Sequence, residues 1–239
     1  MLSCIIPAHN EQTLIGMTLQ ALHDSARACG VDYELVVVDD ASTDTTAETA
    51  ARHGARVIKI EKRQIAAARN AGARAARGDL LLFVDADTWA NPAAVAAVVE
   101  AFRNGAVGGG CLFQFDGPIP LWARGVYAIA IRVMRACRLV GGCFLFCTRD
   151  AFRAMGGFSE ECFAAEEFYF RQGLCRQGRF EVPVPLVTTS GRKLRTHSGW
   201  EILTAILGLA WHGPKTNRGQ KRPDLWYGVR RPDPHDAPE

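Results

Sequence analysis

The N-terminal half of the chain alternates short apolar runs with longer amphipathic segments, and this order constrains the fold more than any other feature of the sequence. The apolar runs are rich in Val, Ile and Leu, which is typical of strands that are covered on both faces. They predict strands at residues 2–6, 34–38, 56–60 and 80–84. The segments between and after them predict helices at residues 11–29, 44–53, 65–77 and 92–102. Strand–helix–strand units form right-handed crossovers, so we predict an α/β fold with a Rossmann-like, mostly parallel sheet flanked by helices.

The second half of the chain is less regular, and its sequence predicts a mixture of elements. We predict strands at 107–115 and 141–147, helices at 121–138, 166–177 and 200–211, and an extended segment at 180–187. No internal repeat and no linker separates two domains, so we expect one domain over residues 1–212. Residues 213–239 are basic and rich in proline, and we expect them to form a loosely packed tail.

Composition and charge exclude several classes of protein. With 48% hydrophobic residues and a net charge of +3, the chain is not disordered as a whole. Its longest stretch without charged residues spans thirteen residues, 202–214, against the ~20 that a membrane-spanning helix requires. The first apolar run stops at Pro7, so we expect no secretory signal and a cytoplasmic protein. Eight cysteines without a C-x-x-C pair indicate buried thiols rather than disulfides or a zinc site.

Basic residues are concentrated towards the C-terminal end. From Arg192 to Arg231 there are nine Lys or Arg residues and two acidic ones. Such a stretch suits contact with phosphate groups or with an anionic membrane surface, and a solvated tail explains it equally well. Arginine outnumbers lysine 23 to 5 across the chain, which indicates genome composition, and we expect no nucleic-acid partner.

Polar clusters follow the predicted strands at the edge where parallel sheets bind their ligands. Residues 7–11 follow the first strand, residues 39–44 the second and residues 85–87 the fourth, while Arg69 and Asn70 lie in the third helix. Unpaired carboxylates are costly to bury. The aspartates of these clusters therefore need a cation, a metal or hydrogen-bond donors nearby.

Asp85 and Asp87 have the spacing of two ligands of one metal ion. In an extended chain, residues i and i+2 point to the same side, so both carboxylates can contact one divalent cation across the small Ala86. Oxygen ligands suit Mg²⁺ or Mn²⁺, and Mg²⁺ completes its shell with phosphate oxygens and water. The alternative is a turn, or a cap that Asp87 supplies to the helix beginning near Pro92.

The order and spacing of these motifs resemble those of family 2 glycosyltransferases. The resemblance covers roughly residues 2–200, and its motifs are SCIIPAHNE at 3–11, VVVDDASTD at 36–44, ARNAG at 68–72, FVDAD at 83–87 and GGFSE at 156–160, followed by Glu166-Glu167. It implies a GT-A fold, a nucleotide-diphosphate sugar donor that we expect to be UDP-linked, and inverting transfer. Residues 1–104 would then be the nucleotide-binding half and residues 105–212 the acceptor-binding half.

The resemblance also implies roles for single residues. Asp85 and Asp87 match the metal-binding D-x-D motif, with Mg²⁺ or Mn²⁺ as the cofactor. The family usually has Glu-Asp where this chain has Glu166-Glu167. Its aspartate is the general base, so Glu167 is the expected base and Glu166 is the alternative. The residues expected to contact the donor are Pro7, Ala8, His9, Asn10, Glu11, Asp39, Arg69, Asp85, Ala86, Asp87, Gly141, Gly142, Arg192 and Lys193.

Several of these expectations have a structural alternative. Arg171, one helical turn after Glu167, would orient that carboxylate or contact the leaving phosphate, or it would form a surface ion pair. His197 would complete the metal shell or lie on the surface. The basic stretch around Arg192 would form a mobile lid over the diphosphate, and Gly141-Gly142 would let the backbone approach the sugar or would form a bend.

The acceptor is not identified by the sequence. An exposed apolar surface on residues 121–138 or 200–211, beside the basic stretch, would suit a lipid-linked acceptor or a peripheral membrane contact; a small-molecule acceptor is the other option. Two further functions stay open. One is a catalytically idle nucleotide-sugar-binding or scaffold protein, which only the Glu166-Glu167 pair suggests. The other is a sugar nucleotidyltransferase, although residues 7–11 lack the glycine-rich loop of such enzymes.

Overall fold

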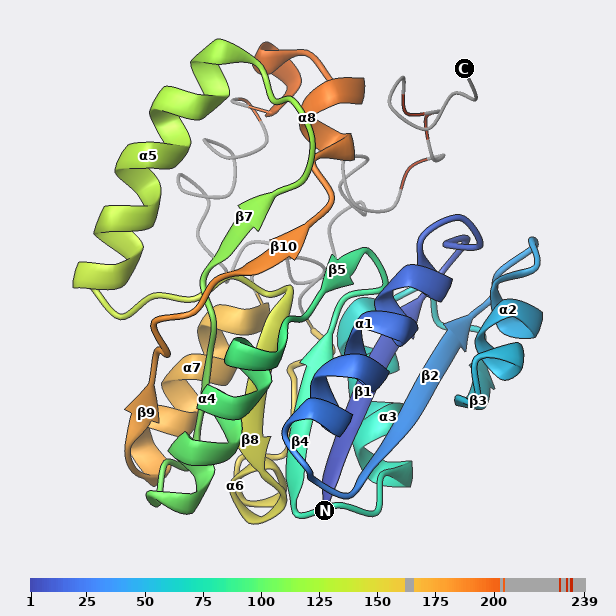
Figure 1. Cartoon of the computed structure of the whole chain (residues 1–239), viewed down its shortest axis with the longest axis vertical. Coiled ribbons are helices and arrows are strands. Elements are labelled where there is room, and N and C mark those ends of the chain that lie inside the picture. The colour runs from blue at the N-terminus through green and yellow to red at the C-terminus, as the bar shows by residue number, and fades with distance from the viewer. Residues whose placement is uncertain (162–165, 203, 205–227, 229–230, 232, 234–239) are drawn as a thin grey trace.

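A seven-stranded sheet forms the centre of the computed structural model, which describes residues 1–161, 166–202, 204, 228, 231 and 233 (Figure 1). The strand order is β3-β2-β1-β4-β8-β6-β9. These strands are β1 (Leu2–Ala8), β2 (Tyr33–Asp40), β3 (Arg56–Ile60), β4 (Leu80–Val84), β6 (Gly108–Gly110), β8 (Phe144–Thr148) and β9 (Phe180–Glu181). β1 pairs in parallel with β2 and β4, and β2 with β3, whereas β8 runs antiparallel to β4 and β6. The predicted α/β fold with a mostly parallel sheet is confirmed.

Helices cover both faces of this sheet. α1 (Ile15–Ala28) and α4 (Pro92–Arg103) pack on one face; α3 (Ile65–Ala75), α6 (Arg149–Ala154) and α7 (Glu166–Gln177) pack on the other. Successive side chains of a strand point to opposite faces, so Ile6 belongs to the core beneath α1 and α4 while Ile5 belongs to the core beneath α3 and α7. The short α2 (Thr46–Arg52) lies beside β3 at the sheet edge (Figure 1).

A second, three-stranded sheet lies beyond the carboxyl ends of β1 and β4 (Figure 1). It has the order β5-β10-β7, with β5 (Thr88–Trp89), β10 (Val187–Thr189) and β7 (Phe113–Phe115). α5 (Leu121–Ala136) packs beside it, and Tyr127 donates a hydrogen bond of 2.6 Å to the carbonyl of Phe113. This sheet and α5 place the second half of the chain over the polar ends of the central strands.

The predicted single strand at 107–115 is wrong, because the chain changes sheets within it. Gly108–Gly110 is β6 in the central sheet, and Phe113–Phe115 is β7 in the second sheet. β6 lies so close to β9 that a Cβ on Gly109 would be 1.9 Å from the carbonyl oxygen of Glu181. Only glycine permits that approach.

Several short or terminal elements differ from the predictions. β5, α6 and α8 (Arg192–Thr196) were not predicted, because segments this short carry too little periodicity. The predicted helix at 200–211 and the tail at 213–239 lie almost entirely outside the described residues. No helix in the described part of the chain is long and apolar enough to cross a membrane. The seven described cysteines are free thiols, but Cys137 and Cys175 are exposed rather than buried.

Candidate active site

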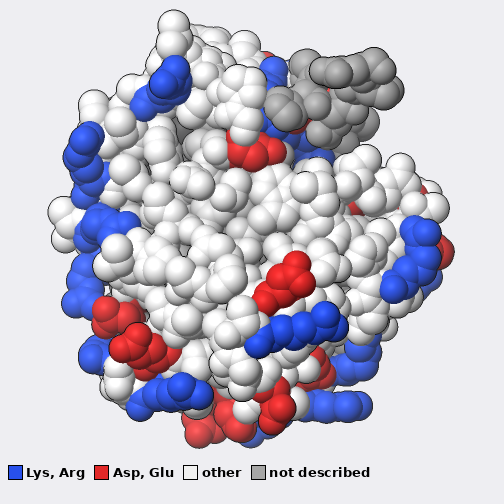
Figure 2. Space-filling model, viewed as in Figure 1, with Lys and Arg blue, Asp and Glu red and all other residues white. Residues whose placement is uncertain are grey.

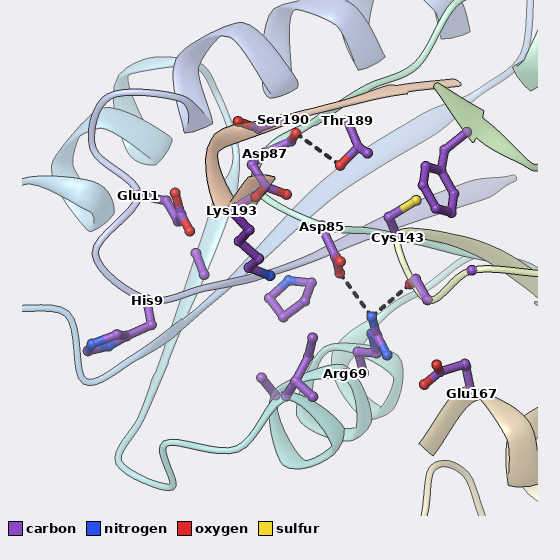
Figure 3. A pocket seen from close by; sticks show the side chains of 18 of the residues that line it. His9, Glu11, Arg69, Asp85, Asp87, Cys143, Glu167, Thr189, Ser190 and Lys193 are labelled. Carbon is purple, nitrogen blue, oxygen red and sulfur yellow. Dashed lines mark hydrogen bonds and ion pairs between the residues drawn. The ribbon is translucent and has the colours of Figure 1, made fainter. Parts of the chain in front are cut away.

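A cavity of about 570 Å³ opens at the carboxyl ends of β1, β2 and β4, where the sequence predicts the ligand site (Figure 3). The two halves of the chain form it together, with β7, α5, α7 and α8 contributing the far walls. The expected site residues that line it are Pro7, Ala8, His9, Glu11, Arg69, Asp85, Ala86, Asp87, Gly141, Gly142, Glu166, Glu167 and Lys193.

Asp85-Ala86-Asp87 forms the turn between β4 and β5. The amide of Asp85 donates to the carbonyl of Cys143, and the amide of Thr88 donates back to the carbonyl of Asp85, each at 3.0 Å. Both carboxylates lie in the cavity wall (Figure 3). Burial raises the pKa of Asp85 above its ordinary value; the cation of Arg69 opposes this rise and the charge of Asp87 adds to it. Asp87 does not cap α4, since the side chain of Asn91 does so by accepting a 2.9 Å hydrogen bond from the amide of Ala94.

Arg69 on α3 connects this turn to the helix that carries the two glutamates. Its side chain is 1% exposed, and its guanidinium donates to Asp85 Oδ1 at 2.9 Å and to Glu166 Oε1 at 2.7 Å. A third hydrogen bond of 2.8 Å reaches the carbonyl of Gly142, and the ring of Phe158 lies 5.2 Å away. A buried arginine needs such partners. Arg69 is therefore a fixed cation shared by two carboxylates from different halves of the chain.

The two glutamates at the start of α7 have different environments. Glu166 is buried at 4% exposure, and its carboxylate is engaged by Arg69. Glu167 faces the cavity (Figure 3). Burial, with the neighbouring charge of Glu166 as a second cause, raises the pKa of Glu167 from 4.5 to about 7. A carboxyl group with this pKa can accept a proton near neutral pH.

α8 carries two basic residues, Arg192 and Lys193, on the side of the cavity opposite Glu167 (Figure 3). Arg192 is 8% exposed, donates to both carboxylate oxygens of Glu11 at 3.1 Å and lies 3.7 Å from Asp87 Oδ2. It therefore holds the loop after β1 and the aspartate turn together from behind the cavity lining. Of these two residues of α8, Lys193 lines the cavity and points into it (Figure 3). This stretch forms β10 and α8, so the expected lid is a packed part of the fold.

Four other expected site residues lie outside the cavity lining. Asp39 accepts a hydrogen bond from the amide of Ser42, and Asn10 accepts one from the amide of Thr43, so both fasten the loop after β2. Arg171 does not reach Glu167; its guanidinium donates to the carbonyls of Cys137 and Arg138 after α5. His197 contacts the hydroxyl of Thr196, and the described residues contain no group of three metal-ligating side chains that includes it.

Several residues that line the cavity were not predicted from the sequence. Asp40, not Asp39, lies in the wall, and its carboxylate accepts hydrogen bonds of 2.7 Å from the amides of Lys62, Arg63 and Gln64. Cys143 also lines the wall, but burial raises its pKa well above the ordinary value, so its thiol stays neutral. An apolar wall is formed by Phe113, Phe115, Met134, Val140, Leu194 and Ile202. In the sequence, the apolar character of these six residues was the only signal of this wall.

Comparison with known proteins shows the family of the chain. Residues 3–154 match the sequence profile of Glycosyl transferase family 2, and they carry the β1, β2 and β4 ends described above. The chain belongs to this family.

Relatives and solved structures agree with this assignment. Validoxylamine A glucosyltransferase of Streptomyces hygroscopicus subsp. jinggangensis (strain 5008) is 37% identical over 125 residues, 48% of this chain and 29% of the relative. Dolichol-phosphate mannosyltransferase of Pyrococcus furiosus is 30% identical over 126 residues, 50% of this chain and 35% of the relative. The matched stretch thus spans about a third of the length of these two relatives.

The mannosyltransferase PcManGT of Pyrobaculum calidifontis, in complex with GDP-Man and Mn²⁺, has a similar structure. It superposes with a TM-score of 0.70 at 21% identity, and the match covers 95% of this chain and 66% of the other. This likeness confirms the expected GT-A fold.

Proposed function

We propose that this family 2 protein transfers a sugar from a nucleotide-diphosphate sugar to an acceptor hydroxyl, with inversion at the anomeric carbon. One observation carries the proposal. A single cavity brings the carboxylates of Asp85 and Asp87 together with Glu167, whose pKa is about 7. The first two come from the end of a central strand and the third from the other half of the chain.

The nucleoside is assigned to the part of the cavity between β1 and the start of α3. Pro7, Ala8 and His9 line it on one side, and Arg63 and Gln64 on the other. The ring nitrogen Nδ1 of His9 lies 2.8 Å from the carbonyl oxygen of Asp40, which fixes the orientation of the imidazole. We propose UDP as the carrier of the sugar, with GDP as the alternative, because the mannosyltransferase of Pyrobaculum calidifontis binds GDP-Man.

The donor set at Asp85 and Asp87 fits a divalent metal. The negative charge of Asp87 raises the pKa of the neighbouring Asp85 carboxyl group. Mg²⁺ is commonly held by one or two carboxylates together with substrate phosphates. Mg²⁺ or Mn²⁺ would stabilise negative charge on the leaving diphosphate. Lys193 adds a further positive charge on the same side of the cavity.

Glu167 is the proposed general base. Near neutral pH a sugar hydroxyl is a poor nucleophile, and a carboxylate within ~3 Å can remove its proton, an effect typically worth 10²–10⁴-fold in rate. The carboxylate of Glu166 is bound to Arg69, which supports Glu167 over Glu166 as the base. Gly142 borders the carboxylate of Glu167, since a Cβ there would lie 3.8 Å from Glu167 Oε2, an ordinary van der Waals distance.

The decisive experiment compares the wild type with Glu167→Gln. We expect the variant to bind UDP with Mn²⁺ as tightly as the wild type in a thermal-shift titration, but to lose donor hydrolysis and sugar transfer across a screen of nucleotide sugars. Glu167→Asp, which restores a carboxylate, serves as the control and should regain part of the activity. Equal turnover by wild type and Glu167→Gln would remove Glu167 as the base.

A second comparison tests the metal site. In Asp87→Ala the affinity for UDP should no longer depend on Mn²⁺, whereas the wild type should bind more tightly when Mn²⁺ is present. An unchanged metal dependence would place the ion elsewhere.

The two alternative functions predict different products. A catalytically idle binding protein would bind nucleotide sugars without releasing UDP in any assay. A sugar nucleotidyltransferase would form a nucleotide sugar and pyrophosphate from a nucleoside triphosphate and a sugar phosphate. Release of UDP from a UDP-sugar, without pyrophosphate, supports the glycosyltransferase.

A further inference from the structure

The outer surface of α5 is apolar and exposed. Ala123 is the buried residue that this 16-residue helix contributes to the interior. Trp122, Val126, Ile129 and Val133 are between 44% and 66% exposed. Their spacing of four, three and four residues puts them on one stripe of the helix, a pattern that normally faces a core. Here the stripe faces outward, and we define it as the α5 stripe.

Three arginines lie on α5 to one side of the α5 stripe. Arg124, Arg132 and Arg135 are the charged residues of α5, and the helix contains no Asp or Glu. Figure 2 shows basic side chains set in uncharged surface over this helix. A helix that combines an exposed apolar stripe with arginines and no acid has the composition of a helix that lies in the plane of a membrane interface.

A second tryptophan extends the α5 stripe at its N-terminal end. Trp200 is 72% exposed, and a Cβ on the preceding Gly199 would lie 3.1 Å from the ring of Trp122. Tryptophan is enriched where a protein meets the headgroup region of a membrane. The neighbouring acid, Glu201, is paired with Arg231 at 2.9 Å, so its charge is compensated.

We propose that the α5 stripe docks on an anionic lipid surface. The arginines of α5 favour an anionic lipid surface over a second copy of the chain as the partner of the α5 stripe. In a symmetric dimer the same patch meets itself, which would bring the arginines of one α5 against those of the other. An anionic membrane instead attracts each of these arginines.

The opposite face of α5 contributes to the active-site cavity. Met134 lines the cavity, one residue after Val133 of the α5 stripe, and Phe113, which Tyr127 binds, belongs to the same apolar wall. Docking through the α5 stripe therefore leaves a single helix, α5, between the lipid and the apolar cavity wall. This identifies the acceptor as a hydroxyl group carried by a membrane lipid, an identification that rests on the proposed glycosyltransferase function.

Vesicle binding by the full chain tests the docking surface. Flotation would be measured with vesicles of phosphatidylcholine alone and of phosphatidylcholine with 30% phosphatidylglycerol. Two double variants are compared with the wild type: Val126→Ser/Ile129→Ser in the α5 stripe and Arg124→Gln/Arg132→Gln beside it. Met17→Ser is the control, because Met17 is a similarly exposed apolar residue (57%) on α1. UDP binding in the presence of Mn²⁺ checks that each variant is folded.

The wild type and Met17→Ser should bind anionic vesicles and not neutral ones. Val126→Ser/Ile129→Ser should bind at least about tenfold more weakly, and each lost arginine should weaken binding roughly fivefold. Absent or charge-independent binding of the wild type, or unchanged binding of the double serine variant, would overturn the proposal. So would a wild-type dimer that Val126→Ser/Ile129→Ser dissociates. Vesicle binding needs no sugar donor, so a protein that binds vesicles but transfers no sugar contradicts the proposed function and not the docking surface.

Discussion

Replacing Glu167 with Gln should stabilise the protein above neutral pH while it abolishes transfer. The pKa of Glu167 in the folded protein is about 7, against an ordinary value of 4.5. Between pH 4.5 and about pH 7, Glu167 keeps its proton in the folded protein but has released it in the unfolded chain. The free energy of unfolding therefore falls as the pH rises through this window. Each pH unit is worth about 1.4 kcal/mol, so the loss approaches about 3 kcal/mol by pH 7 and stays constant above it.

The glutamine side chain escapes this loss because it is neutral at every pH. The free energy of unfolding of Glu167→Gln should equal that of the wild type near pH 4.5 and exceed it by about 3 kcal/mol at pH 8. Urea denaturation followed by tryptophan fluorescence, without metal or nucleotide, measures the difference at pH 5, 6, 7 and 8. Glu100→Gln, at an exposed glutamate of α4, is the control and should change stability equally at all four pH values. A difference for Glu167→Gln that does not grow with pH would refute the reasoning.

Three further results are expected. The value of kcat/KM should rise with pH through about 7 as Glu167 ionises, and a flat profile from pH 5 to 9 would contradict its role as a base. Arg69→Met leaves two carboxylates without their shared cation, so urea denaturation should show a loss of about 3–5 kcal/mol; a loss below about 1 kcal/mol would mean that the contacts of Arg69 are dispensable. Gly72→Ala should cost about 1–3 kcal/mol, because its Cβ would lie 2.4 Å from the side chain of Ile5. Gly125→Ala, which faces open space on α5, should instead stabilise by up to about 1 kcal/mol, and equal effects at the two glycines would argue against the close packing of α3 on β1.

The N-terminal half of the chain could be predicted closely because its signals are local. The bounds of β3 and β4 agree with the prediction to the residue. A glycine lies shortly before each strand, and an acidic residue directly follows it. The polar residues then follow from the rule that parallel sheets bind ligands at their carboxyl ends. Asp40 was missed for a physical reason: β2 is buried on both faces, so the sequence does not show which of two adjacent aspartates points into the cavity.

The second half depends on contacts between distant residues, which the sequence does not encode locally. The break between β6 and β7 follows from the pairing of Gly109 with Glu181. Arg171 lies one helical turn from Glu167, but the carbonyls at the end of α5 are also within its reach and bind it. The different environments of Glu166 and Glu167 could not be predicted either, because they depend on Arg69. That residue lies 97 residues before Glu166 in the chain.

The most direct test of the account is a crystal structure with UDP and Mn²⁺, with the ion located by its anomalous scattering. The account predicts one manganese peak between Asp85 and Asp87, the diphosphate on that peak and on Lys193, and Glu167 across the cavity from both. A diphosphate bound away from the two aspartates, or no manganese between them, would contradict it.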